Sequence, residues 1–260
     1  MKEILINGKT LPEVYHQAIL SLEEEGEIIT CNDWSGMQKE LAMTFVVTDP
    51  LSEPRISRLY PGGFRELQQY TMEMTDGILD FKIGDRDGLC WEYTYHDRIF
   101  NYRGLNQFEW CEQELRRSSD TRRAVIDVRD SIVDTSNTDP ACLQNIQYFI
   151  RNGHLDAMVL MRSNDAVQAS FMNAFAFIVL QSEMAKRLGV PVGTYTHRAN
   201  SFHCYERNFM RLKQYAEAIK GKKNEELTYN YEEFYKELME ESVPEINKTI
   251  ETLKMEMKNR

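Results

Sequence analysis

The sequence predicts an α+β fold in which a mixed β-sheet packs against helices, and three observations favour it. Stretches with the two-residue period of strands interleave with stretches of helical period, without the regular alternation of a doubly wound sheet. Asn152-Gly153 joins two apolar strands and is a strong hairpin signal, because both residues tolerate positive φ. The apolar stretch 170–189 indicates one long, largely buried helix. With 260 residues and 42% hydrophobic content, the chain can bury a full core in one large domain or two small ones.

The first half of the chain is expected to contain three helices and two strands. The first helix begins at Leu11-Pro12, carries an apolar stripe and ends before Gly26. The β-branched and aromatic run LAMTFVVTDP, residues 41–50, predicts a strand that stops at Pro50. AVIDV, residues 124–128, predicts another strand. Between the two strands, apolar residues at helical spacing predict two helices, one with Phe64, Leu67, Tyr70 and Met74 and the other with Phe108, Cys111 and Leu115.

The second half is expected to contain the hairpin, the buried helix and a charged tail. The buried helix closes at Gly189, and Pro191 follows it. From Gly221 onward charged residues dominate and apolar residues are sparse at helical spacing, so we expect two surface helices divided by Pro244. The predicted organisation is a main domain over residues 1–220 and a charged helical extension over residues 221–260.

Composition excludes several classes of function. The net charge is −10 and no long Lys/Arg run occurs, so binding to nucleic acid is disfavoured. The longest apolar stretch, residues 171–180, is too short to cross a bilayer, and the amino terminus lacks signal-peptide features. We therefore expect no membrane partner and a cytoplasmic location. Five widely spaced cysteines without a CxxC pair argue against a disulfide framework and against a structural zinc site.

The hairpin brings a thiol close to a charged cluster. Counting outward from the two-residue loop pairs Arg151 with His154 and places Cys142 opposite Ser163. An arginine at 162 would stabilise the thiolate and hold an anionic substrate next to it. Strict alternation sends Arg162 to the other face, so a bulge, or the length of the arginine, must bring both groups into one pocket. From spacing alone, a small core cysteine and a solvated turn are the commoner interpretations.

Several motifs together resemble the thymidylate synthase family in order and spacing. They span roughly residues 60–210 and are Tyr95, Asp120-Thr121-Arg122-Arg123, Asp139-Pro140-Ala141-Cys142, Gln147, Arg162-Ser163-Asn164-Asp165, Asn173 and His203-Cys204-Tyr205. NIQYFIR and MRSND are particularly similar to the branch that contains archaeal-type synthases and phage pyrimidine-nucleotide hydroxymethylases. The resemblance implies a thymidylate synthase-like fold, with a bulged mixed sheet packed against helices and one sheet face forming a homodimer interface.

The resemblance also implies one-carbon transfer to C5 of a pyrimidine nucleoside monophosphate, from 5,10-methylenetetrahydrofolate and without a metal. Cys142 matches the nucleophile that adds to C6. Arg162 and Ser163 match the phosphate-binding pair. Arg122 and Arg123 match two further phosphate ligands that reach into the partner subunit's site, which requires an isologous homodimer. Outside the family context, these two arginines would be interpreted as solvated residues at a helix terminus.

Other matched positions would bind the base and the sugar. Asn173 matches the residue whose carboxamide donates to O4 and accepts from N3–H of uracil, whereas aspartate would suit the amino group of cytosine. His203 and Tyr205, two apart on an extended segment, match the pair that binds the sugar 3′-hydroxyl. Gln147 matches a polar pocket residue. The respective alternatives are a buried helix asparagine, a core histidine with a packing tyrosine, and a side chain on the sheet face.

Three more matches concern proton transfer and folate. Tyr95 resembles the tyrosine that helps to remove the C5 proton, and its alternative role is packing. Glu66, in FRELQQY, aligns with the catalytic glutamate that orders water at O4. Asp165 matches the site residue that bonds the pterin ring, and its alternative role is a helix cap.

The chain also departs from the family pattern. Leu143 stands where many synthases have histidine, Gln69 replaces a common tryptophan, and Lys39 is a candidate substitute for the phosphate-loop arginine. The charged tail replaces the short peptide that closes over folate, so residues 1–220 are taken as the catalytic domain. A wetter pocket would let water add to the methylene group and give a hydroxymethyl product. Methylation of dUMP to dTMP is favoured. The alternatives are a 5-hydroxymethylase acting on dUMP, dCMP or CMP, and a non-catalytic nucleotide-binding homologue.

Overall fold

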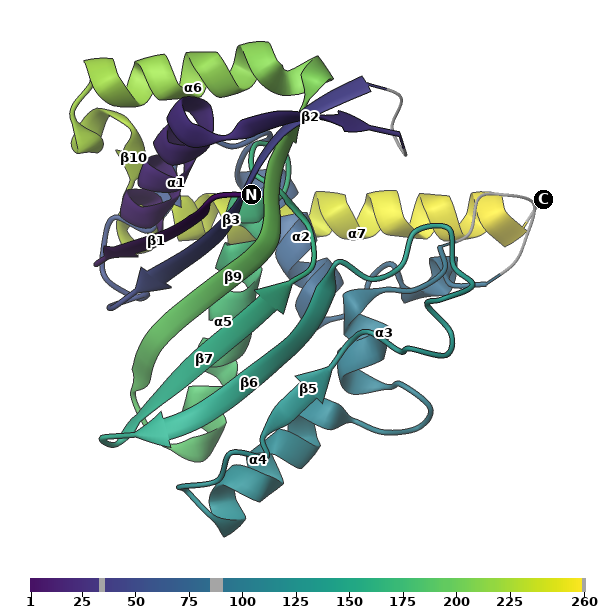
Figure 1. The fold of residues 1–260 in the computed structure, drawn as a ribbon. Coiled ribbons are helices and arrows are strands. Elements are labelled where there is room, and N and C mark those ends of the chain that lie inside the picture. Colours follow the sequence, from purple (N-terminus) through teal and green to yellow (C-terminus); the bar gives the residue numbers. More distant parts are fainter. Residues whose placement is uncertain (33–35, 85–90, 259–260) are drawn as a thin grey trace.

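One mixed β-sheet forms the centre of the computed structural model, which describes residues 1–32, 36–84 and 91–258 (Figure 1). The strands lie in the order β1-β3-β9-β7-β6-β5, with β2 paired to β3 and β8 paired to β9. β1 pairs with β3 and β7 with β9 in parallel, and the other neighbours along this path are antiparallel. The strands are β1 Glu3–Gly8, β2 Glu27–Cys31, β3 Gly36–Val47, β5 Val125–Asp127, β6 Leu143–Arg151, β7 His154–Met161, β8 Asn164–Asp165 and β9 Val192–Tyr205. Two short strands, β4 Ile56–Ser57 and β10 Thr228–Tyr229, form a separate pair.

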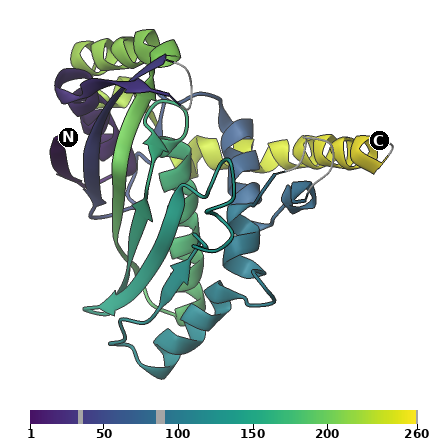
Figure 2. The same ribbon diagram turned by 45° about the vertical axis from the view of Figure 1, so that its right-hand side comes forward.

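Helices cover one face of the sheet and leave the other face uncovered (Figures 1 and 2). The helices of the structure are α1 Leu11–Glu25, α2 Phe64–Thr75, α3 Tyr95–Phe100, α4 Gln107–Arg117, α5 Ser170–Leu188, α6 Phe209–Gly221 and α7 Lys236–Lys258. Of these, α7 packs on α2 and not on the described strands of the sheet. In β7, Leu155, Ala157 and Val159 are buried beneath the helices, whereas Met158 points to the uncovered face and is 48% exposed. None of the described helices combines the length and the apolar character needed to cross a membrane.

The predicted hairpin and buried helix are confirmed. Asn152 and Gly153 have φ values of 51° and 76°, and Arg151 pairs with His154, as a two-residue loop requires. Gly189 ends α5 in the left-handed region at φ 72°, and its N–H bonds to the last turn of the helix. The predicted helices α1, α2 and α4 and the predicted strands β3 and β5 are also present.

The predicted break at Pro244 is wrong, because this residue lies inside the single helix α7. A proline within a helix costs about 3 kcal/mol. Met239, Ile246 and Ile250 around it are buried, and burial of such side chains contributes about 1.5–3 kcal/mol each, which outweighs that cost. Ile246 and Ile250 form an apolar cluster with Met72 and Leu79. The charged tail is therefore docked onto α2 and the turn after it. The boundary at residue 220 stays a prediction.

The sequence patterns do not predict β1 and β2, and they mark only the end of β9 as extended. β9 is a 14-residue strand that lies between β3 and β7. Its buried face includes His197 and His203, which are 0% and 3% exposed, so the apolar alternation of a half-buried strand is interrupted. This strand carries two histidines into the interior, close to the predicted site.

Candidate active site

A β-bulge places Cys142 beside Arg162. The register of β6 with β7 shifts between Leu143 and Asn145, so that Leu143 pairs with Met161. The main-chain N–H of Arg162 donates to the Cys142 carbonyl at 2.8 Å. Cys142 therefore lies opposite Arg162, one position away from the Ser163 that simple counting gives. The bulge that the alternation required is present.

The Arg162 side chain holds the segment that leads into Cys142. Its Nε donates to the Ala141 carbonyl at 3.1 Å, and its Nη2 donates to the Pro140 carbonyl at 2.5 Å. Nη2 also lies 3.8 Å from the Asp139 carboxylate, and the side chain keeps 37% of its surface exposed. The guanidinium is thus fixed near the thiol and retains a side open to an anion.

Burial raises the pKa of the Cys142 thiol above its usual value. The charge of Arg162 lowers this pKa and Asp139 raises it further. Arg162 stabilises the thiolate, as expected, because its charge lowers the pKa of the thiol. Burial has the larger effect and raises this pKa. The resting group at neutral pH is the thiol, and a nucleophilic role requires that its proton be removed.

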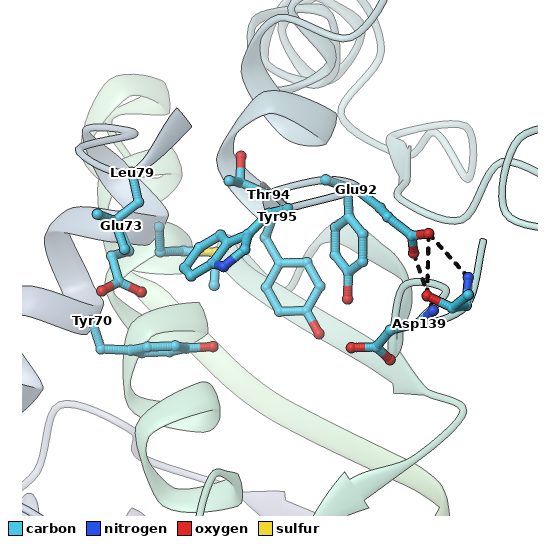
Figure 3. Close-up of a pocket in the computed structure, with 11 residues that line it drawn as sticks. Tyr70, Glu73, Leu79, Glu92, Thr94, Tyr95 and Asp139 are labelled. Carbon is cyan, nitrogen blue, oxygen red and sulfur yellow. Dashed lines mark hydrogen bonds between the residues drawn. The ribbon is translucent and has the colours of Figure 1, made fainter. Parts of the chain in front are cut away.

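A pocket of about 410 Å³ opens beside this segment (Figure 3). The Tyr95 hydroxyl accepts the Leu143 N–H at 3.2 Å, directly after the cysteine. Figure 3 shows the hydroxyls of Tyr70 and Tyr95 and the Asp139 carboxylate directed toward a common space. Aromatic side chains and carboxylates dominate the lining, which consists of Tyr70, Glu73, Met74, Leu79, Trp91, Glu92, Tyr93, Thr94, Tyr95, Thr138 and Asp139.

Two carboxylates of this pocket, Glu73 and Glu92, carry no sequence motif. Burial raises the pKa of Glu73, and the Gln69 side chain donates to it at 2.9 Å. Glu92 accepts the main-chain N–H groups of residues 139 and 138 at 3.1 and 3.0 Å, which lowers its pKa. Glu73 could have been recognised from its place three residues after Tyr70, because positions i and i+3 share a helix face.

Glu66 lies at the amino-terminal end of α2. It is exposed, and its Oε2 accepts the Gly63 N–H at 2.8 Å in a capping box. It is not among the described residues that line the 410 Å³ pocket. Its assignment as the catalytic glutamate stays a prediction, and Glu73 is the glutamate of α2 that reaches this pocket.

Asn173 of α5 belongs to a row of hydrogen-bonded side chains behind the pocket. Its Nδ2 donates to the Tyr70 hydroxyl, and its Oδ1 accepts from Asn164 Nδ2 at 2.9 Å. Asn164 Oδ1 lies 2.9 Å from His197 Nε2, and His197 Nδ1 lies 2.9 Å from the Tyr195 hydroxyl. A carboxamide has two N–H groups and two oxygen lone pairs, so Asn173 keeps one of each for a ligand.

His203 adjoins the Arg162 segment through Ser163. Its Nδ1 lies 3.5 Å from Ser163 Oγ and 3.3 Å from the Ser201 carbonyl. Burial lowers its pKa, so the ring is neutral at pH 7. Its buried Nε2 has no partner among the described residues. The Tyr205 ring meets it edge to face at 4.7 Å. A buried polar atom in this situation is a natural contact for a ligand.

Asp165 accepts hydrogen bonds in the turn that precedes α5, whose N-cap is Ala169 without a side-chain cap bond, so its alternative as the cap of this helix is wrong. Its Oδ1 accepts the main-chain N–H groups of Val167 and Gln168 at 3.0 and 2.9 Å, shortly before α5. In the ladder of β8 with β9, Asp165 pairs with His203. The carboxylate is thus fixed next to the predicted sugar-binding histidine.

Arg122, Arg123 and Gln147 lie apart from the Cys142 group within one chain. Arg122 lines a surface hollow on the uncovered face of the sheet. Gln147 donates to the Arg122 carbonyl at 2.9 Å. Arg123 is 68% exposed, and its Nε donates to Glu114 at 2.9 Å.

Two further ligand expectations can be compared with the structure. Lys39 Nζ lies 3.0 Å from the Glu23 carboxylate, so its charge is already paired within the same chain. Within residues 1–32, 36–84 and 91–258, no group of three or more His, Cys, Asp or Glu side chains is arranged to hold a metal ion. Cys31, Cys111, Cys142 and Cys204 are free thiols, and Cys90 lies outside the described residues.

Comparisons with known proteins agree with one another. A family model described as thymidylate synthase matches residues 61–259. A protein named "Putative thymidylate synthase" from Methanocaldococcus jannaschii is 31% identical over 225 residues, which cover 82% of this chain and 96% of that protein. A deoxyuridylate hydroxymethyltransferase from Bacillus phage SP01 is 31% identical over 133 residues, 46% of this chain and 35% of that protein. The structure of thermostable thymidylate synthase A from Bacillus subtilis superposes with a TM-score of 0.65 at 16% identity, over 80% of this chain and 84% of that one.

Proposed function

This chain belongs to the thymidylate synthase family, and on that premise we propose that it transfers a one-carbon unit to C5 of a uracil nucleotide with Cys142 as the nucleophile. The observation that carries the proposal is the bulge in β6, which sets Cys142 beside Arg162, three residues after Asp139 of the aromatic pocket. Cys142 and Arg162 themselves are not among the described residues that line this pocket. C5 of a pyrimidine is a weak nucleophile until sulfur adds to C6. Because the sulfur attacks the base of the nucleotide whose phosphate is bound, the distance between the thiol and the phosphate-binding group must not exceed the length of one nucleotide.

The reaction gives Cys142 and Tyr95 distinct tasks. The Cys142 thiolate bonds to C6, and the electron pair of the C5–C6 double bond is delocalised onto O4 as an enolate. The family's co-substrate, 5,10-methylenetetrahydrofolate, supplies the carbon that becomes bonded to C5. The C5 proton must then be lost and tetrahydrofolate expelled, which leaves a methylene group on C5. Hydride transfer from the tetrahydrofolate to this methylene group would give the methyl group and release the sulfur, whereas addition of water would give the hydroxymethyl group. We assign assistance in this proton removal to the Tyr95 hydroxyl, whose oxygen is fixed by the Leu143 N–H.

The carboxyl that acts at O4 has two candidates on α2. Glu66 is assigned by its match to the family, although its carboxylate caps the helix. Glu73 lines the pocket, and burial raises its pKa, so it retains a proton more readily than an exposed glutamate does. Glu66→Gln and Glu73→Gln separate the two roles, because only the variant of the acting carboxyl should lose turnover while still binding nucleotide.

The 410 Å³ pocket fits a flat heterocycle such as the pterin of folate. Ligand pockets commonly have volumes of about 300–1,000 Å³. Trp91 and Tyr93 offer aromatic surfaces, and Glu73 and Asp139 offer acceptors for ring N–H groups. We also assign Asp165 to the pterin by its match to the family. The acidic lining does not suit the carboxylate tail of folate, which must point out of this pocket.

The nucleotide would be bound by groups from several elements. Arg162 and Ser163 are assigned to the phosphate, together with Arg122 and Arg123 of a second copy of the chain. We assign Asn173 to O4 and N3–H of uracil, for which it keeps one donor and one acceptor. His203 Nε2 and Tyr205 are assigned to the sugar hydroxyl, and Gln147 to the polar lining. The supporting observation is the buried His203 Nε2, which has no partner among the described residues.

For the product we propose dTMP, formed by methylation in the cytoplasm. The similarity to the archaeal protein covers 82% of the chain, against 46% for the phage hydroxymethyltransferase. Gln69 and the pocket carboxylates favour retained water and thus the hydroxymethyl alternative, since water can then add to the methylene group. We propose residues 1–220 as the catalytic domain and 221–260 as an extension whose helix α7 supports Leu79 of the pocket.

The mass of the product tests this function. Incubation with dUMP and methylenetetrahydrofolate should yield dTMP, and a product heavier by one oxygen would identify a hydroxymethylase. Cys142→Ser should abolish both. Release of tritium from 5-tritiated dUMP reports attack at C6 followed by loss of the C5 proton, whatever the final product. If neither dUMP nor UMP releases tritium but one of them binds, the second candidate, a non-catalytic nucleotide-binding protein, is correct.

A further inference from the structure

A row of buried polar side chains runs from the interior of the sheet to the pocket, and the proposed chemistry uses only one of them. The row is Tyr195, His197, Asn164, Asn173 and Tyr70. Tyr195 and His197 are 0% exposed, Asn164 3% and Asn173 4%. Buried polar groups are costly unless each is hydrogen-bonded, so a row with four members in the core needs an explanation.

His197 gives the row a direction. Burial lowers its pKa to about 3, and its ring stacks on Phe45 with centroids 4.7 Å apart, so it is neutral at physiological pH. A neutral imidazole has one N–H and one acceptor nitrogen. If Nε2 carries the hydrogen, it donates to Asn164 Oδ1. Asn164 Nδ2 must then donate to Asn173 Oδ1, and Asn173 Nδ2 donates to the Tyr70 hydroxyl.

The opposite tautomer would reverse every bond of the row. His197 Nε2 would accept from Asn164, and Asn164 Oδ1 would accept from Asn173 Nδ2. The Asn173 carboxamide would then be turned by 180°. In the first direction its free donor and acceptor match O4 and N3–H of uracil. In the reversed direction the free donor and the free acceptor of Asn173 exchange places. The donor then faces N3 of cytosine and the acceptor faces the amino group of cytosine.

The Tyr195 hydroxyl selects between the two directions. In the first it donates to His197 Nδ1. In the reversed row it would accept from Nδ1–H, and its own hydrogen would need an acceptor. Among the contacts of the described residues, His197 is the one hydrogen-bond partner of this hydroxyl. A buried donor left unsatisfied is unfavourable, so the first direction predominates.

We infer that Tyr195, His197 and Asn164 are positioning residues that hold the Asn173 carboxamide in its uracil-binding orientation and so set the choice of base. This inference rests on the proposed function insofar as a pyrimidine binds at Asn173. None of the three residues needs to touch the nucleotide. Base selectivity would then depend on a tyrosine hydroxyl three hydrogen bonds away from Asn173.

The first test is Tyr195→Phe, measured by equilibrium binding of dUMP and dCMP. The variant keeps the ring and removes the hydroxyl, so the ratio of dUMP to dCMP affinity should fall about tenfold, the effect of one unsatisfied buried donor. The matched control is Tyr148→Phe, because Tyr148 is also 0% exposed and its hydroxyl has no partner in the described part of the chain. The control should keep the wild-type ratio. An unchanged ratio in Tyr195→Phe would overturn the inference.

A second measurement does not depend on the ligand or on turnover. Nitrogen-15 NMR of labelled His197 should show hydrogen on Nε2 and none on Nδ1 in the wild type, and a mixture of tautomers in Tyr195→Phe. Hydrogen on Nδ1 in the wild type would refute the direction argued here. If the wild type binds dUMP but releases no tritium, the proposed function fails, and the binding ratio and the tautomer still decide this inference.

Discussion

Replacing Asp134 with asparagine should destabilise the protein by about 3–5 kcal/mol, because it leaves a buried arginine without its counter-charge. Arg98 and Asp134 side chains are 2% and 0% exposed, and Nη2 donates to Oδ1 at 2.6 Å. The other carboxylate oxygen accepts the Asp130 N–H at 2.9 Å. The single side-chain oxygen of an asparagine can accept from Arg98 or from the Asp130 N–H, but not from both. Its amide nitrogen is itself a donor and would then face the other donor.

The assay is equilibrium unfolding in urea, compared with a matched variant. Glu251→Gln removes the same charge from the Lys254–Glu251 pair, whose side chains are 38% and 60% exposed at 2.8 Å. Exposed pairs contribute about 0–1 kcal/mol, so this control should shift the unfolding free energy by less than about 1 kcal/mol. A loss below about 1 kcal/mol in Asp134→Asn as well would refute the reasoning, since it would mean that the buried arginine finds another partner at no cost.

Three more outcomes are expected. Asp139→Asn should speed alkylation of Cys142 by iodoacetamide at neutral pH by a factor of about 2–5, because Asp139 raises the pKa of this thiol and the thiolate is the reacting form; an unchanged rate would contradict this. His16 and His197 have pKa values lowered by burial to about 4 and about 3, so the folded state takes up these protons later than the unfolded chain. The unfolding free energy should therefore be maximal above about pH 6.5 and fall toward pH 4 by up to about 1.4 kcal/mol per pH unit for each histidine, and a flat urea profile would exclude this. Met158→Arg should convert a dimer into a monomer by light scattering, because Met158 is 48% exposed on the uncovered sheet face; a wild type that is already monomeric would count against the proposed interface.

Local chemistry explains why parts of the fold could be predicted from sequence. Asn152-Gly153 and Gly189 act through backbone conformations that few other residues adopt, so their signals need no tertiary context. The tail behaves differently. Pro244 is a local helix breaker, but burial of Ile246 and Ile250 against α2 outweighs it, and no local pattern reports where a helix will dock.

Sequence motifs predicted some residues of the candidate site, whereas residues that only packing brings to the site were missed. The nearness of Cys142 to Arg162 followed from the hairpin count, but the bulge that completes it is a backbone feature without a sequence signature here. Glu73 was missed because a glutamate in the middle of an amphipathic helix is usually a solvated residue. In the structure Gln69 donates to Glu73, and Glu73 lines the same pocket as Trp91, which is distant in the sequence.

Charge decides whether one chain could bind a nucleotide by itself. The chain has a net charge of −10, and its pocket contains Glu73, Glu92 and Asp139. The nearby cation Arg162 is already bonded to two carbonyls and lies 3.8 Å from Asp139. A phosphate dianion therefore needs further positive charge, and each chain carries Arg122 in a hollow on the uncovered face of its sheet. The neighbouring Arg123 is paired with Glu114, so it would have to leave this carboxylate to bind a phosphate. Two copies that join through that face would cover exposed apolar surface and could offer these arginines to each other, so the charge balance favours the proposed dimer.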